Sequence, residues 1–402
     1  MPATAAAAAA KLPLARRALA AKSSLIRDLL KVTQRPDIIS FAGGLPAPET
    51  FPVEALRVAF DGVLREGGAA ALQYSATEGY PPLREWIAAR ETARGMPTSA
   101  EQVLIVSGSQ QGLDLIGKAM IDEGSPVLVE APTYLGALQS FAQFGAAFVE
   151  LPADENGLRA EGLRAGGGAR FAYVMPNFQN PTGRSLSIEQ REQLAAAARR
   201  HDFWLVEDDP YGELWYREAP PPGMRAFAPE RTIRLGSFSK VLAPGLRIGF
   251  LIAPRAMIDT LVRLKQATDL HTATLAQQGA WRVLDSGLLD THLPAVRARY
   301  ASQCAVMIEA LAASWPGAVQ FTRPAGGMFV WAALPRHIDT MRLLDRAIER
   351  QVLFVPGAAF FADEGAAPAH MLRLSFVTVP PERIRAGVRV LGELIAEVAT
   401  QT

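Results

Sequence analysis

Short runs of hydrophobic and β-branched residues alternate with longer amphipathic stretches between about residues 100 and 255. The short runs have the length of strands, and hydrophobic positions in the longer stretches follow the helical repeat. The predicted strands are Val103–Val106, Val127–Val129, Phe171–Met175, Phe203–Val206, Thr232–Leu235 and Ile248–Ile252, and the clearest helices are Gln110–Ile121 and Ile188–Arg200. This alternation predicts an α/β domain with a mainly parallel sheet flanked by helices.

The pattern changes after residue 255. It predicts three helices, Met257–Lys265, Gln277–Asp285 and Val296–Ser314, and then strands near Gly327–Trp331 and Met371–Phe376. We interpret this as a smaller α+β domain over residues 291–402, beside a large domain over residues 51–290. A helix and connecting segment over residues 21–50 are expected to join the small domain.

The first 27 residues are rich in alanine and contain five basic residues and no acidic one. This composition is shared by organelle transit peptides. Serines are few, however, and Leu25–Lys31 has the pattern of an amphipathic helix. We therefore expect a flexible tip over residues 1–20, followed by a structural helix, in a cytoplasmic protein.

The chain of 402 residues is 49% hydrophobic and 20% charged, with a formal net charge of +1. This balance gives no reason to expect a nucleic-acid or membrane partner, and no apolar stretch approaches the length of a membrane span. Cys304 is the only cysteine, which excludes an internal disulfide and a thiolate metal site. The five histidines show no ligand spacing, so no metal is expected.

Parallel strands gather binding residues at their carboxyl ends, so the residues that follow each predicted strand are the candidates. Ser107–Gly112 follows the first strand and opens a helix, where free N–H groups can bind an anion, although serine and glutamine also serve as ordinary caps. Gly112–Lys118 has the spacing of a P-loop. We reject that interpretation because Ala119 replaces the Mg²⁺-binding Ser/Thr and the interior is helical.

Two further strand ends carry polar residues. Pro176–Gly183 contains two prolines and a glycine that fix a turn, which is either purely structural or aims its amides into a cleft. Glu207, Asp208 and Asp209 end the next strand, and three buried acids are costly unless paired. A metal site lacks further ligands nearby in the sequence, whereas a carboxylate paired with a cationic ring nitrogen fits as well.

The last strand end holds two serines and a lysine, in Gly236–Lys240, followed by an arginine in Gly245–Gly249. Serine hydroxyls and a guanidinium bind phosphate, and a lysine beside them can condense with an aldehyde. Taken alone, this lysine would be read as a surface charge.

In these motifs the sequence resembles the fold-type I aminotransferases, which use pyridoxal 5'-phosphate (PLP). Asn180-Pro181-Thr182-Gly183, the spacing of Asp208 and Tyr211, Ser237-x-Ser239-Lys240 and Gly245-x-Arg247-x-Gly249 occur in the family's order. The resemblance implies a large domain with a seven-stranded sheet, PLP as cofactor, and catalytic roles for Lys240, Asp208 and Tyr211.

The same resemblance assigns the other positions. Lys240 would hold the cofactor and carry the reacting proton, and Asp208 would pair with the pyridinium nitrogen. Tyr211 and Asn180 would bind the phenolic oxygen, and Tyr134 would stack on the ring. The phosphate would be held by Ser109, Gln110, Ser237, Ser239 and Arg247. Arg373 would bind the substrate α-carboxylate, with Asn180 also beside the substrate.

Residues 39–46, 73–80 and 324–331 are similar to the α-aminoadipate and kynurenine-type group. In that group Tyr74 would reach the neighbouring subunit's cofactor and substrate, which implies a homodimer with shared active sites. Gly43 and Gly44 would let the backbone approach the substrate closely. Arg27 matches a mobile arginine that binds a distal carboxylate, or else it lies on a solvated helix face.

The resemblance implies transfer of the amino group from an L-α-amino acid to a 2-oxo acid, with 2-oxoglutarate as the expected acceptor, by a ping-pong mechanism. The donor would be 2-aminoadipate or an aromatic, branched-chain or aliphatic amino acid. A β-lyase, racemase or decarboxylase on the same scaffold is an alternative. A non-enzymatic effector-binding module, as in some bacterial transcription regulators, is less favoured, because about 25 residues before Leu25 leave no room for a winged helix.

Overall fold

The structure is a computed structural model that describes residues 13–20, 29, 37–154, 157–159, 168–363 and 365–400. Its α-helices are α2 (Arg16–Ala20), α4 (Val53–Ala71), α5 (Pro81–Ala93), α6 (Ser109–Met120), α7 (Leu135–Ala142), α8 (Ile188–His201), α9 (Arg255–Asp269), α10 (Thr274–Asp285), α11 (Leu288–Ser314), α12 (Thr340–Glu349) and α13 (Pro381–Thr400). Short 3-10 helices are η1 (Pro48–Thr50), η2 (Ala100–Gln102), η4 (Met224–Ala226), η5 (Pro244–Leu246) and η6 (Gly357–Phe360).

The large lobe is built on a seven-stranded sheet with the order β2-β10-β9-β8-β7-β3-β4. Its strands are β2 (Val103–Val106), β3 (Pro126–Val129), β4 (Ala147–Glu150), β7 (Phe171–Val174), β8 (Trp204–Asp208), β9 (Thr232–Ser237) and β10 (Gly249–Ile252). Only β10 pairs antiparallel with its neighbours. Every residue of β2, β7 and β10 is buried, which explains why these strands are continuous apolar runs rather than alternating ones.

The small lobe contains a four-stranded sheet with the order β11-β12-β15-β14. The remaining strands are β1 (Ile39–Ser40), β5 (Ala153–Asp154), β6 (Gly157–Leu158), β11 (Gln320–Phe321), β12 (Phe329–Ala333), β13 (Val352–Leu353), β14 (Val355–Pro356) and β15 (Met371–Ser375). β1 pairs with β13 in parallel, and the Ser375 N–H donates to the Phe41 oxygen at 2.8 Å. Strand β1 and Phe41 therefore pack on the small lobe.

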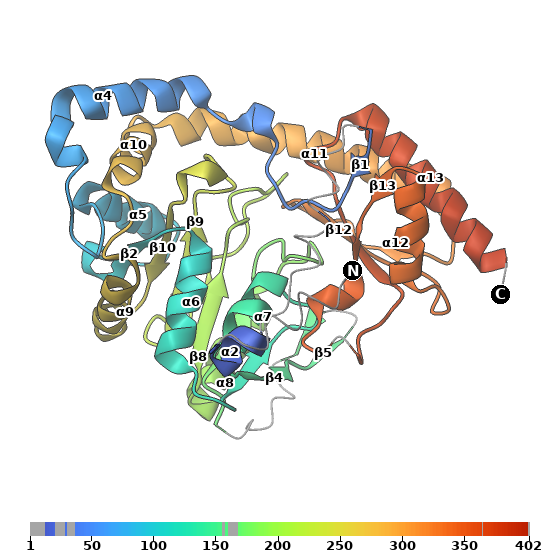
Figure 1. Ribbon diagram of the computed structural model, residues 1–402, viewed down its shortest axis with the longest axis horizontal. Coiled ribbons are helices and arrows are strands. Elements are labelled where there is room, and N and C mark those ends of the chain that lie inside the picture. The colour runs from blue at the N-terminus through green and yellow to red at the C-terminus, as the bar shows by residue number, and fades with distance from the viewer. Residues whose placement is uncertain are drawn as a thin grey trace.

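Figure 1 shows the large lobe on the left and the small lobe on the right, with the long helix α11 running between them. The expected boundary at residue 290 falls within the first turn of α11, so no loop separates the lobes there. The domain limits stay a prediction. The tip over residues 1–20 and the helix near Arg27 lie largely or wholly outside the described residues.

The predicted elements are confirmed with shifts of a few residues, and several helices were missed. Helix α4, which packs along α10 at the top of Figure 1, has a mixed pattern and a kink at Gly68 that hide it in the sequence. The rejection of a P-loop is confirmed, because Gly112–Lys118 is helical and lies within α6. In the described part of the chain, no helix is long and apolar enough to span a membrane.

Candidate active site

Residues at the ends of the central strands line an open cavity of about 500 Å³. Twelve of the fifteen predicted site residues line it: Gly44, Ser109, Gln110, Tyr134, Asn180, Asp208, Tyr211, Ser237, Ser239, Lys240, Arg247 and Arg373. Gly43 is next to this lining without being part of it, and Tyr74 lies on the surface with 77% of its area exposed. Arg27 lies outside the described residues.

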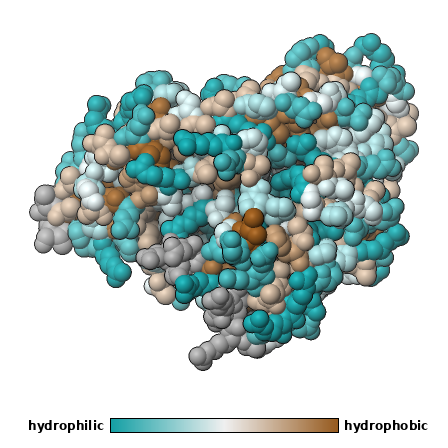
Figure 2. Space-filling model, turned by 180° about the vertical axis from the view of Figure 1, so that it is seen from behind, coloured by the Kyte–Doolittle hydropathy of each residue, from teal (hydrophilic) through white to brown (hydrophobic). Residues whose placement is uncertain are grey.

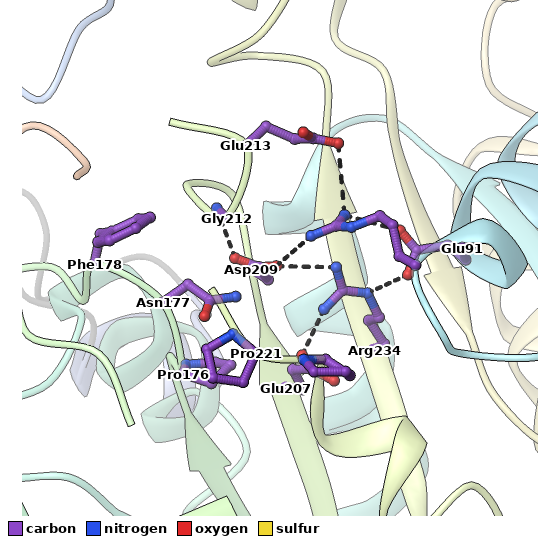
Figure 3. A network of polar contacts seen from close by, with 12 residues as sticks. Glu91, Pro176, Asn177, Phe178, Glu207, Asp209, Gly212, Glu213, Pro221 and Arg234 are labelled. Atoms are coloured by element: carbon purple, nitrogen blue, oxygen red, sulfur yellow. Dashed lines mark hydrogen bonds and ion pairs between the residues drawn. The ribbon is translucent and has the colours of Figure 1, made fainter. Parts of the chain in front are cut away.

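Strand β8 separates its three acids between two faces of the sheet, as alternation along a strand requires. Asp208 faces the cavity, whereas Glu207 and Asp209 face a buried guanidinium on the adjacent strand, that of Arg234. Figure 3 shows this second face, with Arg234 between the acids of β8 and Glu91 of α5. The flanking acids are thus paired, and Asp208 alone is available to a ligand in the cavity.

The Arg234 guanidinium forms ion pairs with three carboxylates. Its nitrogens lie 2.7 Å from Glu91, 2.5 Å from Glu207 and 2.9 Å from Asp209. Burial alone would raise the pKa of Asp209, but Arg234 and Arg94 outweigh it and hold that pKa below its ordinary value. The described residues contain no group of three or more histidines, cysteines and acids placed to hold a metal ion. Glu207 and Asp209 are therefore paired with Arg234 inside the protein.

One carboxylate oxygen of Asp208 accepts a hydrogen bond, and the other has no hydrogen-bond partner among the described residues. The Tyr173 hydroxyl donates to Oδ2 at 2.7 Å, while Oδ1 is buried and has no hydrogen-bond partner among the described residues. Burial raises the pKa of Asp208 to about 7, although the hydrogen bond from Tyr173 opposes that rise. A buried acceptor without a partner is costly, so Oδ1 is suited to a donor that a ligand brings.

Lys240 follows β9 and extends its amine into the cavity, where Nζ donates to the Gly44 oxygen at 2.6 Å. Burial and the nearby cations Arg373 and Arg247 lower the pKa of Lys240 to about 8. A lysine with this pKa is partly neutral near physiological pH, which makes its amine a nucleophile and a base.

Serines, an arginine and a helix N-terminus meet at one end of the cavity. Helix α6 begins at Ser109, so its first N–H groups are free to bind an anion. Arg247 precedes β10, and because β10 runs antiparallel, its start lies at the edge where the parallel strands end. Gly108 has φ +81°, and a Cβ there would lie 2.9 Å from Cζ of Arg247. Glycine therefore leaves the space that the guanidinium occupies.

Arg373 reaches the same cavity from β15 of the small lobe. It donates to Oδ1 of Asn180 at 2.8 Å and to the Ala42 oxygen at 2.5 Å, and its Nε has no partner among the described residues. Its Cζ lies 4.4 Å from the ring centre of Phe329. Burial lowers its pKa to about 10, so the guanidinium is still charged at neutral pH and can bind a carboxylate.

Two tyrosines complete the lining. Burial raises the pKa of Tyr134 to about 12, and it raises the pKa of Tyr211 further above its ordinary value. Both phenols therefore keep their protons and can donate hydrogen bonds. Tyr211 also interacts with Asn180, and its ring packs edge-on against Phe329 at 5.7 Å between centroids.

Sequence reasoning missed Tyr173, Arg234 and Glu91. The first two lie on predicted strands, and the alternation of β8 could have shown that Asp208 and its neighbours face opposite sides. Glu91 gave no signal, because 143 residues separate it from Arg234.

The residues that line the cavity suit the ring nitrogen, the aldehyde and the phosphate of PLP. Oδ1 of Asp208 suits a protonated ring nitrogen, and the Lys240 amine suits an aldehyde. The N-terminus of α6, with Ser109, Ser237 and Arg247, suits a phosphate.

Comparison with known proteins identifies the family. Residues 37–391 match the family model "Aminotransferase class I and II". The chain belongs to this family. Over 385 residues, 93% of this chain and 94% of the relative, it is 46% identical to a 2-aminoadipate transaminase of Thermus thermophilus. It is 43% identical, over 95% of this chain and 93% of the relative, to aromatic-amino-acid aminotransferase 1 of Thermococcus litoralis.

A solved structure of LysN, an α-aminoadipate aminotransferase of Thermus thermophilus complexed with N-(5'-phosphopyridoxyl)-L-leucine, superposes with a TM-score of 0.88. That structure is 42% identical, and the match covers 97% of this chain and 98% of that one. This aminotransferase is therefore a PLP-dependent enzyme of amino-acid transamination, with fold type I and a similarity to the aminoadipate and kynurenine group.

Proposed function

We propose that the enzyme moves the amino group of 2-aminoadipate, or of an aromatic, branched-chain or aliphatic L-amino acid, to 2-oxoglutarate. The observation that supports this most directly is the placing of Lys240 and Arg373 in one cavity with Asp208. A base, a carboxylate-binding group and a partner for the ring nitrogen are what transamination needs from the protein. The names of the relatives supply the donor classes.

When bound, PLP supplies an electron sink for the charge that develops when the α-proton is removed. The chain's residues do the rest. Arg373 binds the substrate α-carboxylate and orients the Cα–H bond, and Asp208 keeps the ring nitrogen protonated. Lys240 takes the proton from Cα and delivers it to C4′ of the cofactor. Ser109, Ser237 and Arg247 hold the phosphate. Hydrolysis would release a 2-oxo acid and leave the amino group on the cofactor, and a second 2-oxo acid would receive that amino group by the reverse sequence.

Replacing the lysine tests this assignment. Lys240→Ala removes both the cofactor-binding amine and the base, so turnover should fall by at least about a thousandfold. Borohydride reduction of the wild-type holoenzyme, followed by peptide mass mapping, should place the cofactor on Lys240. Lys118→Ala, which removes a surface lysine of α6 paired with Asp114, is the matched control. Transaminase activity retained by Lys240→Ala would refute the assignment.

The same assay separates the alternatives. A racemase, a β-lyase or a decarboxylase would turn over an amino acid without a 2-oxo acid acceptor, whereas a transaminase requires both substrates in ping-pong order.

The role proposed for Arg27 is tested by Arg27→Ala, which should weaken the use of 2-aminoadipate and glutamate and spare leucine.

We also propose a homodimer with shared active sites. Helix α4 and the segment after it expose large apolar side chains, those of Val53, Val58, Leu64, Leu72 and Tyr74. In Figure 2, hydrophobic residues appear among hydrophilic ones along the upper edge of the molecule, where α4 lies. A second copy covering this surface would bring Tyr74 to the partner's cavity. The cytoplasmic location and the absence of nucleic-acid and membrane partners stay predictions from the sequence.

A further inference from the structure

The position of Asp208 is set by one residue that the family motifs do not include. Tyr173 lies on β7, beside β8, and the registers place both side chains on the same face of the sheet. Tyr173 is fully buried, and Phe141 of α7 contacts its ring edge-on at 5.8 Å between centroids. Its hydroxyl is thus held in place 2.7 Å from Oδ2 of Asp208, while Oδ1 of this cavity-lining residue has no partner among the described residues.

The direction of this hydrogen bond is fixed. Burial and the charge of Asp208 raise the pKa of Tyr173 well above its ordinary value, so the phenol keeps its proton and donates. A donor to a carboxylate stabilises the charged form of that carboxylate. Tyr173 therefore opposes the effect of burial on Asp208.

The other charges near Asp208 act on it in opposite directions, since Glu207 and Asp209 raise its pKa and Arg234 lowers it. The groups that face it are Tyr173 from β7, Glu207 and Asp209 from its own strand, Arg234 from β9, and Tyr134 and Tyr211 from the cavity. Glu207 and Asp209 are bound to Arg234 on the far face of the sheet. Among the described residues, Tyr173 is then the group that donates a hydrogen bond to Asp208 itself.

We propose that Tyr173 is a positioning residue of the transamination reaction: it orients Asp208 and keeps it charged, so that Oδ1 accepts a hydrogen bond from the protonated ring nitrogen of PLP. This inference rests on the proposed function. A neutral Asp208 would donate its own proton instead, and the ring would lose the positive charge that lets it withdraw electrons. Tyr173 thus acts on the reaction through Asp208.

The test is Tyr173→Phe, which removes the hydroxyl and keeps the ring. The protonation of the cofactor's ring nitrogen is followed by NMR with ¹⁵N-labelled PLP as the pH is raised. Losing a hydrogen bond to a charged group should lower the pH at which this nitrogen loses its proton by about one unit or more. Pyridoxine 5'-phosphate, which has no aldehyde to react with Lys240, should bind about tenfold more weakly or worse.

Tyr216→Phe is the matched control, since the Tyr216 hydroxyl donates to the Gly327 oxygen at 2.8 Å and not to Asp208. It should change neither measurement. Asp208→Asn has no carboxylate at this position and therefore gives the largest expected effect. The pH at which the ring nitrogen loses its proton in Tyr173→Phe should lie between the values for Asp208→Asn and the wild type. In Tyr173→Phe, kcat should fall while KM for the amino donor stays within about threefold.

A ring nitrogen that keeps its proton over the same pH range in Tyr173→Phe as in the wild type would overturn the inference. Failure of the proposed function would look different, because the wild type would then transfer no amino group from these amino acids to 2-oxoglutarate, whatever the protonation of the ring nitrogen. If the Tyr173→Phe protein does not fold, a protein with 3-fluorotyrosine at position 173 is used in its place. The phenol of 3-fluorotyrosine is more acidic and is therefore a stronger hydrogen-bond donor. The same NMR measurement should then show the opposite shift, and no shift would overturn the inference.

Discussion

Burial sets the chemistry of single residues in this cavity. Lys240 and Asp208 lie in the same cavity, and burial moves their pKa values in opposite directions, to about 8 and about 7. Both shifts favour the uncharged form, because a low-polarity surrounding disfavours charge. The hydrogen bond from Tyr173 opposes the shift at Asp208, whereas Arg373 and Arg247 add to the shift at Lys240. Lys240 is thus brought near the pH at which it must exchange a proton, whereas Asp208 depends on Tyr173 to stay charged.

The lysine gives a prediction at this scale. Only the neutral amine of Lys240 attacks an aldehyde, so the rate at which the apoprotein takes up PLP should rise about tenfold per pH unit and level off near pH 8. Stopped-flow absorbance at a series of pH values measures this rate. Arg373→Leu removes a neighbouring cation that lowers the pKa of Lys240, so the plateau should move to higher pH. An unchanged profile in Arg373→Leu would show that Arg373 does not influence the amine.

Strands and their ends are the elements that the sequence predicted best. The apolar runs from Val103 to Ile252 correspond to buried strands, and polar residues that follow them line the cavity. The direction of β10 was not predictable, because its apolar run reads the same in either direction. The pairing of Glu91 with Arg234 depends on how α5 packs on the sheet, which no local pattern encodes. Local periodicity thus predicted the strands and their ends, resemblance to the family singled out the site residues, and long-range packing determined what supports them.

The turn before α6 gives a prediction at the scale of elements. In Gly108→Ala, the new methyl group would collide with the Arg247 guanidinium, so binding of pyridoxine 5'-phosphate should weaken about tenfold or more. Gly124→Ala is a matched control, since Gly124 has φ +82° and an added Cβ would meet nothing within 4 Å. Both variants should also lose about 1–3 kcal/mol of folding free energy, because φ is positive at both positions and Gly108, with ψ 160°, lies in a region almost confined to glycine. Thermal unfolding and titration calorimetry measure both effects, and equal affinities in the two variants would contradict the proposed role of Arg247.

At the scale of the whole molecule, residues from distant parts of the chain come together to form the site. Gly44 comes from the segment packed on the small lobe, Arg373 comes from the small lobe itself, and Lys240 comes from the large lobe. The motif order in the sequence predicted this convergence through resemblance to the family. Arg27 and residues 1–12 of the Ala-rich tip lie outside the described residues.

Shared active sites give a prediction at the scale of the dimer. Tyr74→Ala and Lys240→Ala should each be inactive alone, because one lacks the group reaching the partner's cofactor and the other lacks the base. A hybrid dimer would have one site with both residues intact. After subunit exchange in a 1:1 mixture, about a quarter of wild-type activity should return if subunits pair at random around a two-fold axis. No recovery, despite hybrid dimers seen by native mass spectrometry, would contradict shared sites.

The alternation of β8 makes the pairing register of a single strand part of the enzyme's chemistry. A deletion or insertion of one residue ahead of Glu207 would rotate the strand's side chains to opposite faces. One of the acids now bound to Arg234 would then point into the cavity, and Asp208 would join the buried ion pairs. The composition would be almost unchanged, yet the carboxylate in the cavity would no longer sit beside Tyr173. Length changes that surface loops tolerate should therefore be lethal to function within β8, even where the sheet still forms.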